Sequence, residues 1–121
     1  MKAIHILMVL LFASGMGAGQ LLLKLAAYRH PSVGEQGQLF RLLWMVLDWP
    51  FLLGALLYVV LMVSWVWLLT FLPLSRAYPF TFVSMIVATI GGAIIFGESI
   101  SLRFLLGVAV ITAGLILIGT E

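Results

Sequence analysis

Residues 51–72 read FLLGALLYVVLMVSWVWLLTFL, a run without a single charged side chain. An α-helix rises about 1.5 Å per residue, so a helix of this length would be roughly 33 Å long. The hydrocarbon core of a bilayer is about 30 Å thick. Pro50 directly precedes the run and suits the first turn of a helix. The stretch therefore predicts a transmembrane helix.

Three further apolar runs lie on either side of this segment. The first spans about residues 4–27 and continues past a possible signal-peptide cleavage point near Gly19, which favours a retained helix. The third spans residues 78–96, with Tyr78 and Pro79 as its first turn, after a tight connection that contains Arg76. The fourth spans residues 102–119, and Ser101 suits its N-cap.

Residues 39–49, LFRLLWMVLDW, are too short to cross a membrane and carry Arg41 and Asp48 between tryptophans. Such residues favour the membrane–water interface, so a short interfacial helix before the second span is one interpretation. A tilted extension of the second span is the other. The sequence leaves both open.

Composition supports a membrane protein of one domain covering residues 1–121. Hydrophobic residues make up 64% of the chain and charged residues 8%, whereas about a quarter of the residues in a soluble domain are charged. The predicted fold is an all-α, four-helix, up-down transmembrane bundle with both termini on one side. Net charge of +2 does not indicate nucleic-acid binding, and cysteine is absent.

No catalytic or metal site is visible. His5 and His30 are far apart in the sequence, and neither has a nucleophile or a paired carboxylate in register. We therefore expect no enzyme activity, no metal and no cofactor.

The charged residues also predict an orientation. Lys24, Arg29, Arg41 and Arg103 fall on one side of the membrane, against Lys2 and Arg76 on the other. The positive-inside rule then places the loops after the first and third spans in the cytoplasm.

A stripe of small and polar residues runs along the first helix. Ala13, Gly17, Gln20 and Lys24 follow one another at spacings of four, three and four, and so share one face. Lipid offers no hydrogen bonds, so this face predicts the wall of an internal cleft. Alternatively, Lys24 extends to the lipid headgroups and Gln20 bonds a neighbouring helix. The pattern of Gly15 and Gly19 predicts a close-packing face.

Two other features concern partners. Glu98 shares its membrane face with Lys24 and Arg103 and could pair with either, or remain an exposed loop carboxylate. In the last helix Gly107, Ala113 and Gly114 let another backbone approach closely, which predicts a homodimer or a heterodimer with a similar subunit.

These residues also resemble a known group of transporters. Ala77-Tyr78 after a proline-containing loop, then Gly97-Glu98, then Gly107 and Gly114 in a final apolar helix, resemble the drug/metabolite transporter superfamily, including its small multidrug resistance and EamA-like members. The drug exporters among them carry a glutamate at the position of Met16 and a tryptophan at the position of Thr81. Both departures argue against proton-coupled export of cationic drugs.

Within the superfamily, Ala18-Gly19-Gln20 with Lys24, Ala77-Tyr78-Pro79 and Glu98 are most similar to the ArnE/ArnF family of flippase subunits. That resemblance implies transfer of an undecaprenyl-phosphate-linked aminoarabinose across the bacterial inner membrane, for lipopolysaccharide modification, by a paired-subunit assembly without an ATP site.

A lipid-linked phosphosugar needs cations for its phosphate and hydrogen bonds for its sugar. Lys24 and Arg103 could bind the phosphate, and Gln20 and Tyr78 could bind hydroxyl groups. Glu98 and Arg76 complete the candidate substrate-binding residues. Two alternatives remain: a small-cation or multidrug exporter, and a non-transporting accessory subunit of a membrane glycosyltransferase.

Overall fold

The computed structural model describes residues 3–29 and 37–120, except the side chain of Gln38. Its helices are α1 (Ala3–Arg29), α2 (Gln38–Leu47), α3 (Trp49–Leu69), α4 (Leu74–Ala77), the 3₁₀ helix η1 (Tyr78–Phe82), α5 (Val83–Phe96) and α6 (Leu102–Gly119). Within the described part, four segments are long and apolar enough to cross a membrane: α1, α3, Leu74–Phe96 and α6. The prediction of an all-α protein with four spans is confirmed.

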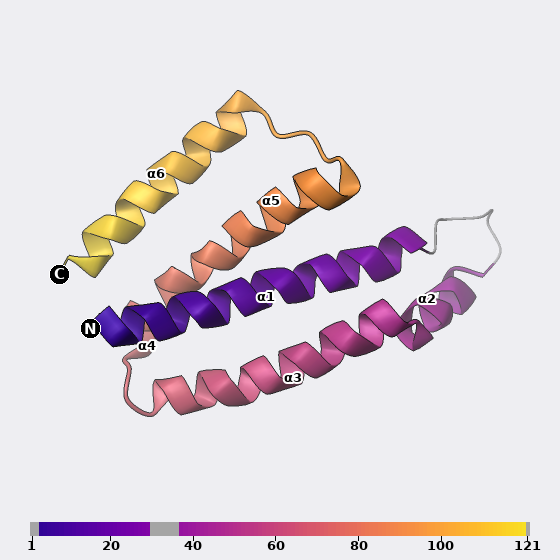
Figure 1. The fold of residues 1–121 in the computed structure, drawn as a ribbon, viewed down its shortest axis with the longest axis horizontal. Helices are drawn as coiled ribbons and strands as arrows, with labels where there is room; N and C mark the ends of the chain where they lie inside the picture. Colours follow the sequence, from indigo (N-terminus) through magenta and orange to yellow (C-terminus); the bar gives the residue numbers. More distant parts are fainter. Residues whose placement is uncertain (1–2, 30–36, 121) are drawn as a thin grey trace.

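Helix α1 is the centre of the arrangement. It packs against α3 on one side and α5 on the other. Successive spans run in opposite directions, and both chain ends lie at the same end of the molecule (Figure 1). The up-down topology is therefore as predicted.

Glycines make both of these contacts close. A Cβ atom at Gly15 would lie 3.0 Å from Leu61 of α3, and one at Gly19 would lie 2.8 Å from the ring of Tyr58. Gly17 faces α5 instead, where its Cβ would lie 2.6 Å from Val87 Cβ. The predicted close-packing face of Gly15 and Gly19 is confirmed, and Gly17 adds a second one.

The centre of the predicted stripe is therefore a packing seam. Ala13 and Gly17 are buried, and Gly17 lies directly against α5. The expectation that Ala13 and Gly17 line an internal cleft is wrong. The small residues of α1 let a neighbouring helix pack closely, and this packing fills the space that a substrate would need. Of the four residues in the stripe, only Gln20 and Lys24 are exposed.

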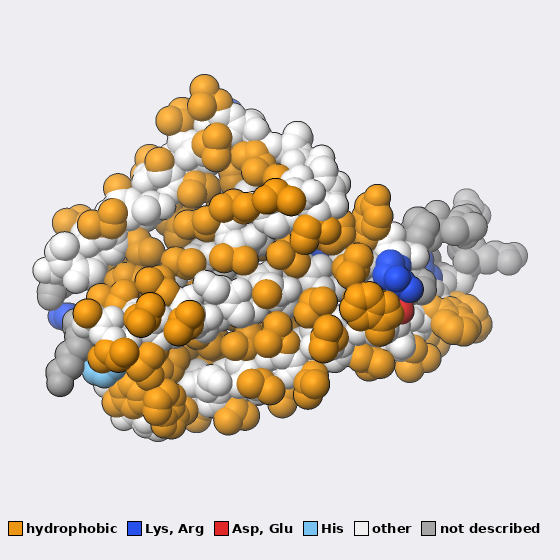
Figure 2. Space-filling view, viewed as in Figure 1, with side chains coloured by type: hydrophobic (Ala, Val, Ile, Leu, Met, Phe, Trp, Pro, Cys, Tyr) orange, Lys and Arg blue, Asp and Glu red, His pale blue; other side chains and the backbone are white. Residues whose placement is uncertain are grey.

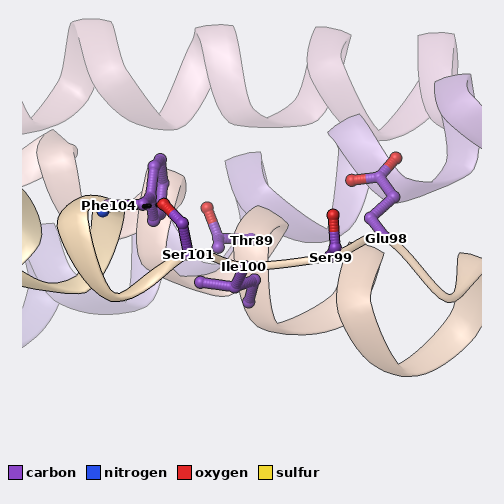
Figure 3. A pocket seen from close by; sticks show the side chains of 6 residues that line it. All are labelled: Thr89, Glu98, Ser99, Ile100, Ser101 and Phe104. Carbon is purple, nitrogen blue, oxygen red and sulfur yellow. Dashed lines mark hydrogen bonds between the residues drawn. The ribbon is translucent and has the colours of Figure 1, made fainter.

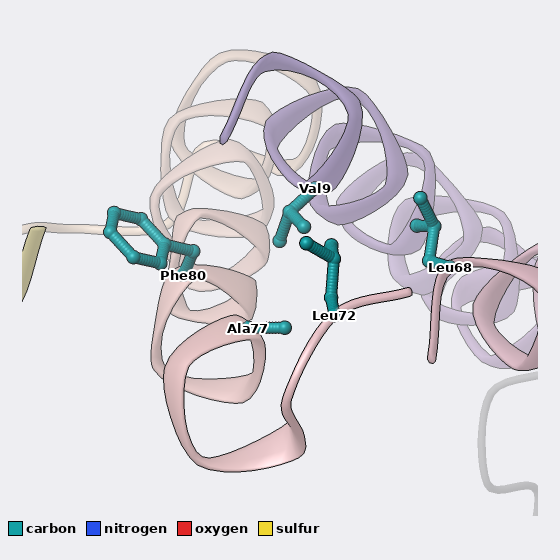
Figure 4. Close-up of a cluster of buried hydrophobic side chains, with 5 residues drawn as sticks. All are labelled: Val9, Leu68, Leu72, Ala77 and Phe80. Carbon is teal, nitrogen blue, oxygen red and sulfur yellow. The ribbon is translucent and has the colours of Figure 1, made fainter. Parts of the chain in front are cut away.

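A small apolar core closes the end of the molecule near the termini. Val9, Leu68, Leu72, Ala77 and Phe80 are buried there and come from α1, α3 and the segment that follows α3 (Figure 4). Most other apolar side chains are exposed, and they cover much of the face seen in Figure 2. Such a surface suits lipid, which is as apolar as the side chains themselves.

Helix α2 is separate from α3, so the interpretation of residues 39–49 as an extension of the second span is wrong. Asp48 breaks the helix with an extended backbone, and its carboxylate accepts a hydrogen bond from the Trp49 N–H at 2.9 Å. Pro50 follows in the first turn of α3. Arg29 at the end of α1 donates to Asp48 at 2.8 Å and lies 5.7 Å from the Trp49 ring centroid. This corner fixes the end of α1 to the start of α3.

The third span begins earlier than expected, at Leu74 rather than residue 78. Pro73 precedes α4, and Pro79 lies in the first turn of η1, where its missing N–H is tolerated. Arg76 therefore lies on a helical turn rather than in a connecting loop.

Helix α6 differs from the other spans because none of its residues is buried. Figure 1 shows it angled away from α5. Leu115 packs against the small core, and the Gly119 backbone lies near the Phe80 ring. The predicted N-cap is confirmed, since the Ser101 hydroxyl accepts the Phe104 N–H at 3.1 Å. The bundle is thus three packed spans and a fourth held mainly near its C-terminal end.

Candidate functional site

Charged side chains gather where the C-terminal end of α1 meets α2 and the α5–α6 connection. We call this region, formed by Lys24, Arg29, Arg41, Asp48 and Glu98, the polar end. Figure 2 shows basic and acidic side chains together at the corresponding end of the molecule. Hydrophobic side chains cover much of the remaining surface in that view, with a basic and a histidine side chain at the opposite end. A lipid with a polar headgroup could bind here, because a charged surface for the headgroup lies next to an apolar surface for the tail.

Lys24 and Glu98 form an ion pair across the polar end. Lys24 Nζ lies 3.8 Å from Glu98 Oε1, and the two side chains are 53% and 51% exposed. This pairing is one of the two that the sequence left open for Glu98. An exposed pair of this length contributes little to stability, so a ligand could replace either partner at small cost.

Two glycines allow Glu98 to reach α1. Gly97 has a left-handed backbone with φ of 68°, and the N–H groups of Gly97 and Glu98 both donate to the Gly92 carbonyl. The carboxylate then folds back over Gly92, where an added Cβ would lie 2.7 Å from Glu98 Oε2. Glycine is needed at position 97 for its backbone and at position 92 for space.

A depression of about 450 Å³ lies at the α5–α6 connection, and we call it the hydroxyl depression. Figure 3 shows its polar oxygen atoms on one side of the connecting segment, with the Ile100 side chain on the other. Its lining, among the described residues, contains one carboxylate, three hydroxyl groups and no basic side chain: Thr89, Glu98, Ser99, Ile100, Ser101 and Phe104.

A second depression, of about 600 Å³, lies between α1 and α2 and is lined by Lys24, Ala27, Tyr28 and Arg41. We call it the basic depression. Its described lining contains two cationic side chains and no carboxylate. Arg41 was not among the predicted site residues. The available signal was a basic residue on the short helix after the first span, but only the fold places α2 beside Lys24.

Gln20 and Arg103 take different positions from those expected. Gln20 lies near Tyr58 of α3, and the Tyr58 hydroxyl donates to the Met16 carbonyl at 3.1 Å. Gln20 thus fits the helix-to-helix alternative, while it remains exposed. Arg103 is exposed in the first turn of α6, and it is not one of the residues that line either described depression.

Tyr78 and Arg76 lie at the opposite end of the bundle, near the start of α1. The Tyr78 ring centroid is 6.4 Å from that of Trp65, and both residues line a mostly apolar depression of about 540 Å³ with Leu74, Ser75 and Pro79. The structure therefore does not bring Tyr78 together with Gln20, which the prediction of a shared sugar site requires.

The predicted dimer-packing residues of α6 are exposed. A Cβ at Gly107 or Gly114 would meet no atom within 4 Å, and Ala113 is exposed beside them. Within the described residues this face is not used by the chain itself. In the same part of the chain, no group of three or more His, Cys, Asp or Glu side chains is placed to hold a metal ion.

Sequence comparison gives the family. Residues 1–120 match the EamA-like transporter family. The chain belongs to that family. An EamA-like chain with four membrane-crossing segments is a multi-pass membrane protein, here of the bacterial inner membrane.

Two curated relatives of this EamA-like chain cover most of its length. A protein of Hamiltonella defensa is 35% identical over 95% of the chain and 96% of its own length. One of Sodalis glossinidius is 31% identical over 86% of each. Both are named probable 4-amino-4-deoxy-L-arabinose-phosphoundecaprenol flippase subunit ArnE. No solved structure matches the chain.

Proposed function

We propose that this EamA-like chain is a subunit of a flippase for an undecaprenyl-phosphate-linked amino sugar of the aminoarabinose type. The names of its full-length relatives support that substrate class. The structural observation that carries the proposal is the place of Lys24. It lines the basic depression and pairs with Glu98 of the hydroxyl depression, at one end of a bundle whose spans are mostly apolar.

The basic depression suits the phosphate of such a lipid. Lys24 and Arg41 can both form charge-assisted hydrogen bonds to phosphate oxygens, and the Tyr28 hydroxyl adds a neutral donor. Because Lys24 is about half exposed, the phosphate can reach it without rearrangement of α1.

The isoprenoid tail needs an apolar surface open to the bilayer. A depression of about 320 Å³ runs between α1 and α3 and presents one hydroxyl among apolar side chains: Met8, Leu11, Phe12, Leu61, Ser64, Trp67 and Leu68. In our proposal the tail lies along such lipid-facing surface while the headgroup is held at the polar end.

The other candidate residues take secondary places in this proposal. Gln20 stabilises the α1–α3 seam below the headgroup, and Arg103 adds positive charge at the start of α6. Tyr78 and Arg76 lie at the far end, where the headgroup would leave. A second, similar subunit would pack on the Gly107, Ala113 and Gly114 face of α6 and close the path.

Reconstitution in liposomes with a labelled polyprenyl-phosphate amino sugar tests the function. Movement of the lipid between leaflets with this protein alone would contradict a purely accessory role. Lys24→Ala should abolish movement while the protein stays folded in detergent, and Lys24→Arg should retain part of it because the charge remains. Full transport by Lys24→Ala would mean that Lys24 only extends to the headgroups of the surrounding bilayer and does not bind the substrate.

The structure offers nothing in favour of the cation-exporter alternative. The drug exporters use a carboxylate at the position of Met16, whose carbonyl here accepts the Tyr58 hydroxyl in the α1–α3 seam. Helix α1 carries no acidic residue. Resistance of an expressing strain to quaternary ammonium compounds should therefore equal that of an empty-vector strain.

A further inference from the structure

The two depressions at the polar end carry opposite charge. Among the residues that the structure describes, the basic depression is lined by Lys24 and Arg41 without a carboxylate, whereas the hydroxyl depression is lined by Glu98 without a cation. The Lys24–Glu98 ion pair, at 3.8 Å, connects them. A ligand lying across both would meet positive charge at one end and negative charge at the other.

We propose that the polar end recognises a zwitterionic headgroup, in which Glu98 binds the protonated amine of the sugar while Lys24 and Arg41 bind its phosphate. This inference rests on the proposed function and adds the chemical group that selects the substrate. An amino group at carbon 4 lies across a sugar ring from the anomeric carbon that carries the phosphate. The two charges of the ligand are thereby held apart, as are the two depressions.

The state of the ion pair supports this assignment. Lys24 and Glu98 are both about half exposed, and their separation leaves room for closer partners. A zwitterion would replace the Lys24–Glu98 pair by two pairs with the ligand, one between Lys24 and the phosphate and one between Glu98 and the amine. Because little desolvation has to be repaid, the exchange is favourable whenever both ends of the ligand are charged.

The surroundings of Glu98 also fit a sugar. Thr89, Ser99 and Ser101 present hydroxyl oxygens on the same side of the connecting segment as the carboxylate (Figure 3). Hydroxyl groups both donate and accept hydrogen bonds, which matches a polyhydroxylated ring. An N-acylated sugar would satisfy these hydroxyls equally well but would leave Glu98 without a cationic partner. The site should therefore distinguish the free amine from the acylated one.

The test uses two radiolabelled lipids that differ only at the amine: a polyprenyl-phosphate-linked 4-amino-4-deoxy pentose and its N-acetyl counterpart. Equilibrium binding of each is measured with the full chain in nanodiscs. Wild type should bind the free amine about tenfold or more tightly than the N-acetyl lipid. Glu98→Gln keeps the size of the side chain and removes its charge, so it should lose this preference.

One further variant serves as a control. Arg41→Gln should weaken binding of both lipids by the same factor, because both carry the phosphate. Circular dichroism confirms that each variant is folded.

The outcomes separate this inference from the proposed function. If wild type binds both lipids without preference, or if Glu98→Gln keeps the preference or weakens both lipids equally, the role of Glu98 is refuted and the flippase proposal stands. If wild type neither binds nor moves either lipid, the proposed function fails with it.

Discussion

The α1–α5 seam makes a quantitative prediction about Gly17. A Cβ added there would lie 2.6 Å from Val87 Cβ and 2.9 Å from the Ser84 carbonyl oxygen. Neither neighbouring atom can move by a simple side-chain rotation, since one is the first side-chain atom and the other is backbone. Carbon atoms in contact prefer about 3.5–4.0 Å, so Gly17→Ala requires α1 and α5 to separate by about 1 Å.

The expected cost follows from two opposing effects. Overpacking of this kind destabilises by about 1–3 kcal/mol, while replacing a helical glycine with alanine stabilises by about 0.5–1 kcal/mol. We therefore expect Gly17→Ala to lower the free energy of unfolding by about 1–2 kcal/mol, which changes the folded-to-unfolded ratio by about 5- to 30-fold.

The assay is unfolding by SDS in mixed micelles, followed by helical circular dichroism. Gly107→Ala is the matched control, because it makes the same chemical change on a transmembrane helix where the new Cβ meets no atom within 4 Å. That variant should be as stable as wild type or slightly more stable. Equal unfolding curves for the two variants would refute the account of the seam.

Three other predictions concern the polar end and α6. Gly92→Ala should displace the Glu98 carboxylate from its position over α5 and so reduce lipid movement. Its SDS unfolding curve should stay close to that of wild type. Unchanged lipid movement would count against the role of the folded-back carboxylate. Asp48→Ala removes both the cap of α3 and the Arg29 ion pair. It should lower the free energy of unfolding by about 1 kcal/mol in the same SDS titration. An unaltered curve would mean that this corner adds no stability. Gly114→Leu should lower chemical crosslinking between subunits in membranes without destabilising the monomer. Crosslinking at the wild-type level would place the interface elsewhere.

Much of the fold follows from the sequence because the bilayer restricts what an apolar segment can do. A run such as residues 51–72 has to form a helix, since lipid leaves no other way to satisfy the backbone. Local chemistry also predicts the Ser101 cap correctly. The predicted third span starts too late because Pro79 suits a first helical turn, and the 3₁₀ geometry of η1 that lets the helix begin at Leu74 is not visible in the sequence.

The site was predictable only in part. Lys24 and Glu98 could be placed on the same membrane face from topology, and the structure pairs them. Arg41 is not predictable because its place beside Lys24 depends on how α2 lies against α1, ahead of the break at Asp48. Tyr78 and Gln20 share a chemical type, but the fold places Tyr78 beside Trp65 and Gln20 beside Tyr58, at different levels of α3.

The arrangement of α6 shows what apolarity alone does not decide. Its sequence is as hydrophobic as that of α3, yet none of its residues is buried in the chain. Hydropathy gives the same signal for a helix that faces lipid and one that faces protein, because lipid tails and leucine side chains are alike. Glycine separates the two cases: Gly17 is in contact with another helix, whereas Gly107 and Gly114 have the same small surface with nothing against it. A helix surrounded only by lipid has no use for such a surface, so the open glycines of α6 are the reason to expect a second subunit there.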